Sequence, residues 1–81
     1  MSNHFDYYRE AKEIATLLAK SGDKKTSDLV LEKIEAGSTA TEILMGVRWA
    51  IEGRLKERGI LLGDLEKRML SLVARIDGAL K

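Results

Sequence analysis

The absence of proline, combined with glycines that separate apolar-periodic stretches, is the feature that most constrains this chain. Proline breaks helices most strongly, and the helix-favouring residues Ala, Leu, Glu, Lys, Arg and Ile dominate the composition. Gly22, Gly37 and Gly59 each follow such a stretch, where glycine can adopt the left-handed conformation that ends a helix. The sequence therefore predicts an all-α domain of four helices, over about residues 4–20, 23–36, 40–58 and 62–80.

Amphipathic patterns support the first and the last of these helices. Asn3 is placed to cap the first helix, and apolar residues then recur at spacings of three and four. The stripe of the first helix is Tyr7, Ala11, Ile14 and Leu18. The stripe of the last helix is Leu62, Leu65, Met69, Leu72, Ile76 and Ala79. Because the predicted loops are short, we expect successive helices to pack side by side as one compact domain over residues 1–81.

The third predicted helix has the clearest start and the most apolar body. Thr39 and Glu42 have the spacing of a capping box, in which the hydroxyl bonds forward and the carboxylate reaches back. From Ile43 to Ile51 the only charged residue is Arg48. A helix that is apolar nearly all round is expected to be buried on more than one side. The sequence therefore predicts that this helix is the central one.

Chain length limits how the fold can be stabilised. A domain of 81 residues buries only about 60–65% of the surface of its unfolded chain, and small domains often add disulfides, a metal or a partner subunit. The chain has no cysteine, and its single histidine is His4, so neither a disulfide nor a Cys/His zinc site can form. Self-association is the remaining means of stabilisation, and we expect no cofactor or metal.

Charge and hydropathy exclude several partners. The formal net charge is +1 with acids and bases interspersed, which is typical of a solvated surface and not of one that binds nucleic acid or anionic lipid. No apolar run approaches the roughly 20 residues of a membrane span, and the first residues lack the pattern of a signal peptide. We therefore expect a cytoplasmic protein with no membrane partner.

No residue pattern indicates catalysis. Glu10 and Glu13 could form a carboxylate pair, but Arg9 and Lys12 lie between and beside them, so a salt-bridged surface is the favoured interpretation. Neither GxGxxG nor GxxxxGK[ST] occurs, because Gly46 and the other glycines do not have that spacing. The sequence predicts that the chain is not an enzyme.

The second and third predicted helices, which meet at the Gly37 turn, superficially suggest a helix-turn-helix. A recognition helix must present polar and basic side chains to the DNA groove, but the third helix offers Arg48 and otherwise mostly apolar residues. The basic residues around the last hairpin are nearly cancelled by Glu52, Glu57, Asp64 and Glu66. Nucleic acid is therefore the least favoured partner.

The second side of the third helix is the candidate partner-binding site. Met45, Gly46, Trp49 and Gly53 lie opposite the side formed by Val47 and its apolar neighbours. Each glycine costs about 1 kcal/mol against alanine in a helix, so two on one side suggest close approach of another backbone. Trp49 and Met45 supply apolar, adaptable contact area. The alternative is that the first or fourth helix of the same chain covers this side.

The segment AGSTATEILMGVRW, residues 36–49, resembles a block of small helical bacterial proteins of unassigned function, in which a GSTxTEILMxLRW-like run follows a short amphipathic helical pair. More loosely, the size, helix content and lack of a catalytic site resemble small α-helical immunity proteins encoded beside bacterial toxins. That resemblance implies a protein partner. Immunity proteins against nucleases are commonly acidic, and the net charge of +1 departs from this pattern.

Three functional hypotheses follow from the sequence. The first is a non-catalytic protein-binding module, such as an immunity or antitoxin-type inhibitor that occludes a partner protein. The second is a self-assembling homodimer with a structural or regulatory role. The third is a DNA-binding regulator. The apolar second side of the third helix supports both protein-binding hypotheses and does not choose between them.

Overall fold

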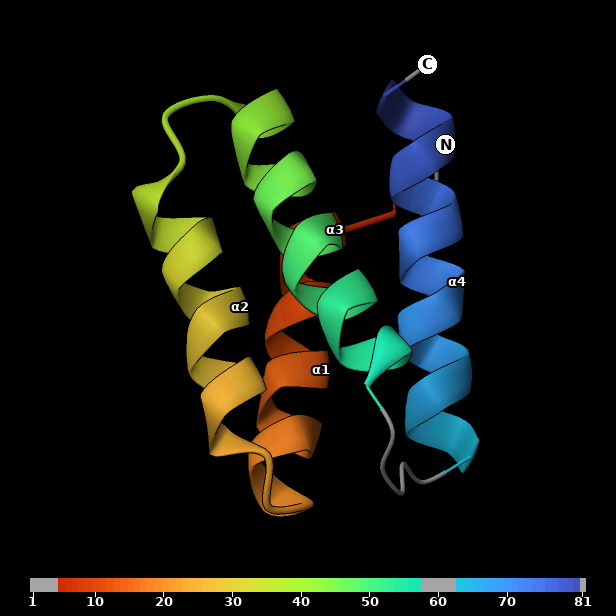
Figure 1. Cartoon of the computed structure of the whole chain (residues 1–81). Helices are drawn as coiled ribbons and strands as arrows, with labels where there is room; N and C mark the ends of the chain where they lie inside the picture. The colour runs from red at the N-terminus through yellow and green to blue at the C-terminus, as the bar shows by residue number, and fades with distance from the viewer. Residues whose placement is uncertain (1–4, 58–62, 81) are drawn as a thin grey trace.

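The structure, a computed structural model, describes residues 5–57 and 63–80. The described residues form no strand and four helices: α1 (Tyr7–Lys20), α2 (Lys24–Ala36), α3 (Ala40–Lys56) and α4 (Gly63–Leu80). Successive helices run in opposite directions (Figure 1). α1 packs against α2 and α4, and α3 packs against the same two helices. The predicted all-α four-helix fold is confirmed.

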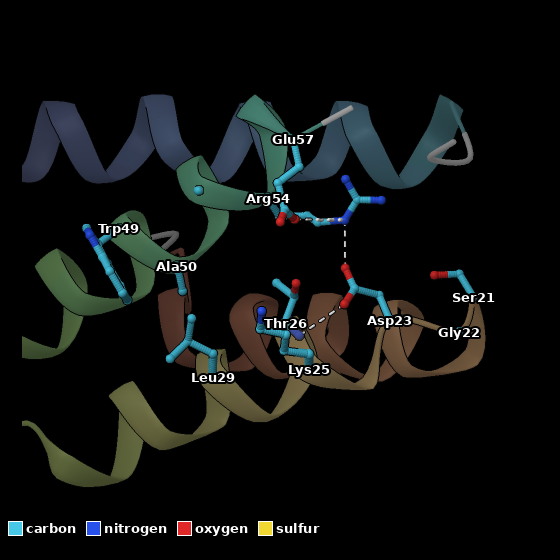
Figure 2. Close-up of a pocket in the computed structure, with 11 residues that line it drawn as sticks. Ser21, Gly22, Asp23, Lys25, Thr26, Leu29, Trp49, Ala50, Arg54 and Glu57 are labelled. Carbon is cyan, nitrogen blue, oxygen red and sulfur yellow. Dashed lines mark hydrogen bonds and ion pairs between the residues drawn. The ribbon is translucent and has the colours of Figure 1, made fainter. Parts of the chain in front are cut away.

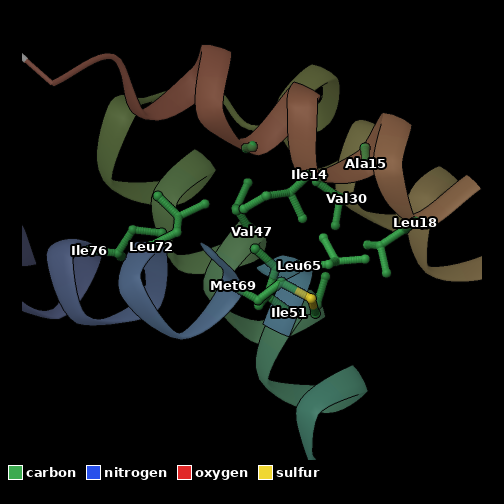
Figure 3. Packing of buried hydrophobic residues seen from close by; sticks show 12 residues of the cluster. Ile14, Ala15, Leu18, Val30, Val47, Ile51, Leu65, Met69, Leu72 and Ile76 are labelled. Carbon is green, nitrogen blue, oxygen red and sulfur yellow. The ribbon is translucent and has the colours of Figure 1, made fainter. Parts of the chain in front are cut away.

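The core is built from one side of each helix, and the predicted stripes of the first and last helices supply most of it, except that Tyr7 is half-buried and Ala79 is exposed. Ile14, Leu18, Ile51, Leu72 and other residues from all four helices meet in the centre (Figure 3). The buried apolar set is Ala11, Ile14, Ala15, Leu18, Val30, Val47, Ala50, Ile51, Leu65, Met69, Leu72 and Ile76. α2 contributes only Val30 to this set, which agrees with the largely polar start of that helix. Burial of these stripes, at about 25 cal/mol per Å² of apolar surface, is what holds the helices together.

The start of α1 corrects the prediction. We expected the first helix to begin near residue 4 with Asn3 as its cap, but α1 begins at Tyr7 and Asp6 is its N-cap. Asp6 has an extended backbone, and its carboxylate accepts a hydrogen bond from the Arg9 backbone N–H at 3.0 Å. Asp serves this role as well as Asn, so local propensity did not separate the two positions. Asn3 itself lies outside the described residues.

The turn between α1 and α2 confirms the role predicted for Gly22. Gly22 has a φ of +97°, in the left-handed region that favours glycine. The backbone N–H of Asp23 donates to the Leu18 carbonyl at 2.8 Å, and that of Gly22 donates to the Ala19 carbonyl at 3.1 Å. This pair of bonds is the Schellman motif, which satisfies the last carbonyls of α1. Asp23, expected as the first helical residue, is instead the N-cap of α2.

Gly37 ends α2, but not for the predicted reason. Its φ of −71° and ψ of 138° are extended values that any residue can adopt, so the left-handed conformation expected there is wrong. A Cβ at this position would instead overlap the side chain of Ile43 and lie 3.0 Å from the Ile43 backbone nitrogen. Glycine therefore makes room for the start of α3.

Thr39 caps α3 as predicted, but the capping box is formed only in part, because the Glu42 carboxylate accepts from the Thr39 hydroxyl and not from its backbone N–H. The Glu42 backbone N–H donates to the Thr39 hydroxyl oxygen at 3.1 Å, and that hydroxyl donates to the Glu42 carboxylate at 3.3 Å. The helix ends at Lys56, two residues before the predicted end, with Glu57 as its C-cap. Two residues with predicted roles lie outside the described residues. They are Gly59, predicted to end the third helix, and Leu62, predicted to begin the stripe of the last helix. α4 begins at Gly63, one residue after its predicted start.

The prediction that α3 is central and buried on more than one side is wrong. Like the other helices, α3 packs mainly against two neighbours and buries one side, through Val47, Ala50 and Ile51. Its other side carries Met45 and Trp49, which are 54% and 61% exposed. In an arrangement of four helices around one core, every helix has an outer side, whatever its composition.

Candidate functional site

The outer side of α3 brings together the apolar side chains that sequence reasoning singled out. Met45 and Trp49 lie four residues apart, one turn along the helix, and both are more than half exposed. Gly53 follows one further turn along and is also exposed. We use "the outer side of α3" for these three residues with Glu42 and Lys56 at the two ends. The alternative that α1 or α4 covers this side within the chain is wrong.

Gly46 belongs to a contact inside the chain. A Cβ on Gly46 would lie 3.0 Å from Cβ of Lys33, 3.2 Å from its Cγ and 3.1 Å from its Cδ. The Lys33 side chain of α2 therefore passes directly over Gly46, and its ammonium nitrogen reaches 4.9 Å from the centre of the Trp49 ring. At this distance the cation and the ring attract each other. The close approach predicted at Gly46 exists, but a lysine stem makes it and not a second backbone.

Gly53 differs from Gly46 although the two are seven residues apart on one side of the helix. A Cβ on Gly53 would have no atom of another element within 4 Å. The helix-propensity cost of about 1 kcal/mol at Gly53 is therefore not offset by packing inside the chain. Within the chain, the expected close approach occurs at Gly46 and not at Gly53.

An open groove of about 660 Å³ lies beside the outer side of α3, between the start of α2 and the end of α3. Figure 2 shows Trp49 at one end of the groove and Arg54 at the other, with Leu29 and Ala50 between them. Gly53 also lines this groove, and the absence of a side chain there keeps it open. The groove thus combines an aromatic wall, a small apolar floor and a charged end.

The charged end of the groove is an ion pair between helices that sequence reasoning missed. Arg54 Nε lies 2.6 Å from the Asp23 carboxylate, and the Thr26 backbone N–H donates to that carboxylate at 3.1 Å (Figure 2). Burial alone would raise the pKa of the Asp23 carboxyl, but hydrogen bonds from Thr26 and Arg54 outweigh it and hold the pKa below the ordinary 3.8. Asp23 therefore caps α2 and anchors α3 at once. No sequence pattern indicates this pair, because its members are 31 residues apart.

Glu10 and Glu13 form a salt-bridged cluster, as the sequence predicted, but their main partner is on α4. Arg68 donates to the Glu10 carboxylate at 2.7 Å and to the Glu13 carboxylate at 2.8 Å. The hydrogen bond from Arg68, with that from Arg9, holds the pKa of Glu13 below its ordinary range, against a smaller opposing effect of burial. A carboxyl that acts as a general acid needs a raised pKa, and that of Glu13 is lowered. We therefore interpret this cluster as an ion-paired contact between α1 and α4.

The described ranges contain neither a cluster of metal ligands nor a membrane-spanning helix. Within residues 5–57 and 63–80, no three His, Cys, Asp or Glu side chains are grouped so that they could hold a metal ion. None of the four helices combines the length and the apolar character that crossing a membrane requires. No family model, curated protein or solved structure matches this chain.

Proposed function

We propose that this chain is a non-catalytic protein-binding module that contacts its partner through the outer side of α3. The observation that carries the proposal is the exposure of Trp49, the only tryptophan of the chain, at 61%. Tryptophan is enriched among the residues that dominate binding energy at protein interfaces, and methionine is common on adaptable binding surfaces. The Lys33 contact at the ring holds Trp49 against α2, which lowers the entropy lost when a partner binds.

The form of this function that we favour is an immunity or antitoxin-type inhibitor, which occludes the working surface of another protein. The small helical fold supports it, because a preformed rigid face can cover a partner's site without first having to order itself. The loose resemblance of the chain to immunity proteins supports the same form. We place its action in the cytoplasm, in agreement with the lack of cysteine.

Regulation by DNA binding is the least supported of the three hypotheses. Arg48, Arg54 and Arg68 each lie within 2.7 Å of a carboxylate on another part of the chain. Side chains that are held in ion pairs would have to break them to reach phosphates or base edges. A self-assembling homodimer is the second candidate, and it is favoured by the exposed acid and base, Glu42 and Lys56, near the two ends of α3.

Matched variants test the proposed function. Tagged wild-type chain, Trp49→Ala and Leu70→Ala are compared for the proteins they retain from an extract of the source cells, identified and quantified by mass spectrometry. Leu70 is the control because it is 54% exposed and belongs to a different helix, α4. We expect Trp49→Ala to weaken retention of the specific partner by about 30-fold or more and Leu70→Ala to leave it unchanged. Equal retention by the two variants would contradict the proposal.

A further inference from the structure

The outer side of α3 has a symmetric pattern centred on Trp49. Glu42 lies seven residues before Trp49 and Lys56 lies seven residues after it, and all three are exposed. Met45 lies four residues before Trp49 and Gly53 four residues after it, and these are exposed as well. Steps of three, four and seven residues stay on one side of an α-helix. One half of this side therefore carries an acid and a large residue, and the other half carries a small residue and a base.

Such a pattern is complementary to itself. When two identical helices pack antiparallel across a two-fold axis, a residue that precedes the axis faces the residue that follows the axis by the same number of positions in the other copy. We propose that a second copy of this chain binds the outer side of α3 in this way, with the axis at Trp49. This inference develops the second candidate, the self-assembling homodimer, and rests on the proposal that the outer side of α3 is a protein-binding surface.

Shape complementarity supports the arrangement. Met45 of each copy faces Gly53 of the other, where the space that a Cβ would occupy has no neighbour within 4 Å. A long, flexible methionine fills such a space readily. The same contact supplies a reason for a glycine in the body of α3 that packing inside the chain does not supply. Gly46, in contrast, is already covered by Lys33 of its own chain.

Charge complementarity supports it as well. Glu42 of each copy faces Lys56 of the other, so the dimer has two such pairs related by the axis. The Glu42 side chain accepts one hydrogen bond, from the Thr39 hydroxyl, and stays exposed. Lys56 forms no ion pair with any residue in the part of the chain that the structure describes. Antiparallel packing also places the opposite ends of the two helix dipoles beside each other.

The expected association is weak. One helix of 17 residues from each copy forms the contact. We expect this contact to bury less than the roughly 800 Å² per partner that a standard stable interface buries. We expect dissociation constants on the order of micromolar, so that concentration decides whether the outer side of α3 is free. Trp49 lies at the axis, and as the only tryptophan its fluorescence should shift to shorter wavelength as the dimer forms.

Charge reversal tests the geometry. Sedimentation equilibrium and tryptophan fluorescence are measured from micromolar to millimolar chain for wild type, Glu42→Lys, Lys56→Glu and an equimolar mixture of the two variants. Each variant alone places two like-charged pairs at the interface, and we expect its homodimer to be about tenfold weaker at low salt. In the mixture both pairs are again opposite in sign, and we expect the affinity to return to that of wild type.

The mixture is the decisive sample, because changes in helix stability affect each chain whether it is alone or mixed. Recovery in the mixture supports the antiparallel dimer. A mixture that associates no more tightly than the separate variants would overturn it, and so would a wild-type chain that stays monomeric throughout the range. If the chain is monomeric and Trp49→Ala still loses a captured protein, the proposed function stands and the second copy is excluded. If the charge-reversal variants associate tightly only when mixed, and capture does not depend on Trp49, the dimer stands and a foreign partner on this surface is excluded.

Discussion

The two sides of α3 look alike in sequence and differ in the structure. On the inner side Val47 and Ile51 are fully buried against the other helices, while on the outer side Met45 and Trp49 are more than half exposed. Both sides are apolar, and one of them contributes nothing to the core of this chain. The difference teaches that an almost uninterrupted apolar run in a helix can combine a side that is buried in the core with a second side that stays exposed.

The largest expected contrast is between Ile51 and Trp49. Ile51→Ala removes a fully buried side chain, and we expect it to lower the free energy of unfolding by about 2–5 kcal/mol. Trp49→Ala removes a larger but exposed side chain and should change that free energy by about 0.5 kcal/mol or less. Urea unfolding followed by circular dichroism, at chain concentrations well below the dimer range, measures both. A similar loss for the two variants would mean that the outer side also supports the fold.

The second contrast is between two carboxylates, Asp23, which pairs with Arg54 of α3, and Asp28, which pairs with Lys24. Asp23→Asn keeps an N-cap for α2, since Asn caps as well as Asp, but leaves the Arg54 guanidinium without its carboxylate. We expect a loss of about 1.5–3 kcal/mol in the free energy of unfolding at neutral pH. Asp28→Asn is the control because the Asp28–Lys24 pair is solvent-exposed, and it should cost about 0.5 kcal/mol or less.

The Asp23–Arg54 pair also predicts that the stability of the fold depends on pH. Because the folded-state pKa of Asp23 is lower than the ordinary 3.8, its contribution is fully present well above that value and is lost as the pH falls through the lower folded-state value. The wild-type chain should therefore lose stability from about pH 5 downward, and Asp23→Asn should lose less over the same range. Thermal melts between neutral pH and acid test this. Parallel curves for the two proteins would show that the Arg54 contact does not favour the charged carboxylate.

The third contrast is between the two glycines of α3. Gly46→Leu forces a side chain against Cβ of Lys33, which cannot move without a shift of α2, and we expect a loss of about 1–3 kcal/mol. At Gly53 a Cβ meets no atom of another element and the position borders an open groove, so we expect the Gly53→Leu monomer to be as stable as wild type or more stable. Chemical unfolding of the dilute variants decides the matter. Equal destabilisation of both would show that the space at Gly53 is closed in solution.

The smallest expected effect isolates the proposed interface. Gly53→Ala and Gly78→Ala both replace a helical glycine whose Cβ has open space, so each should stabilise the monomer by about 1 kcal/mol. Only Gly53→Ala places a methyl group where Met45 of a second copy would lie. Sedimentation of the two variants at equal concentration should therefore show weaker association for Gly53→Ala alone. Identical association would remove the support that Gly53 lends to the dimer.

Most of the fold was accessible from the sequence because its signals are local. The apolar spacing predicted much of the buried side of the first and last helices, including Leu18 and Ile76, and the Thr39–Glu42 spacing predicted the start of α3. Gly22 was correctly identified because the left-handed conformation is an intrinsic property of a single residue. These features depend on residues within about one or two helical turns of each other, which is the range that periodicity and capping describe.

The sequence by itself thus determined four helices and most of the buried side of the first and the last of them. Only the tertiary structure decided what each residue contacts across helices. It placed Arg54 on Asp23 and Arg68 on Glu10, gave Gly37 the role of making room for Ile43, and left Trp49 exposed. Local sequence patterns do not predict these contacts, because they join residues on different helices. Which side of a helix faces the core depends on how the other three helices pack.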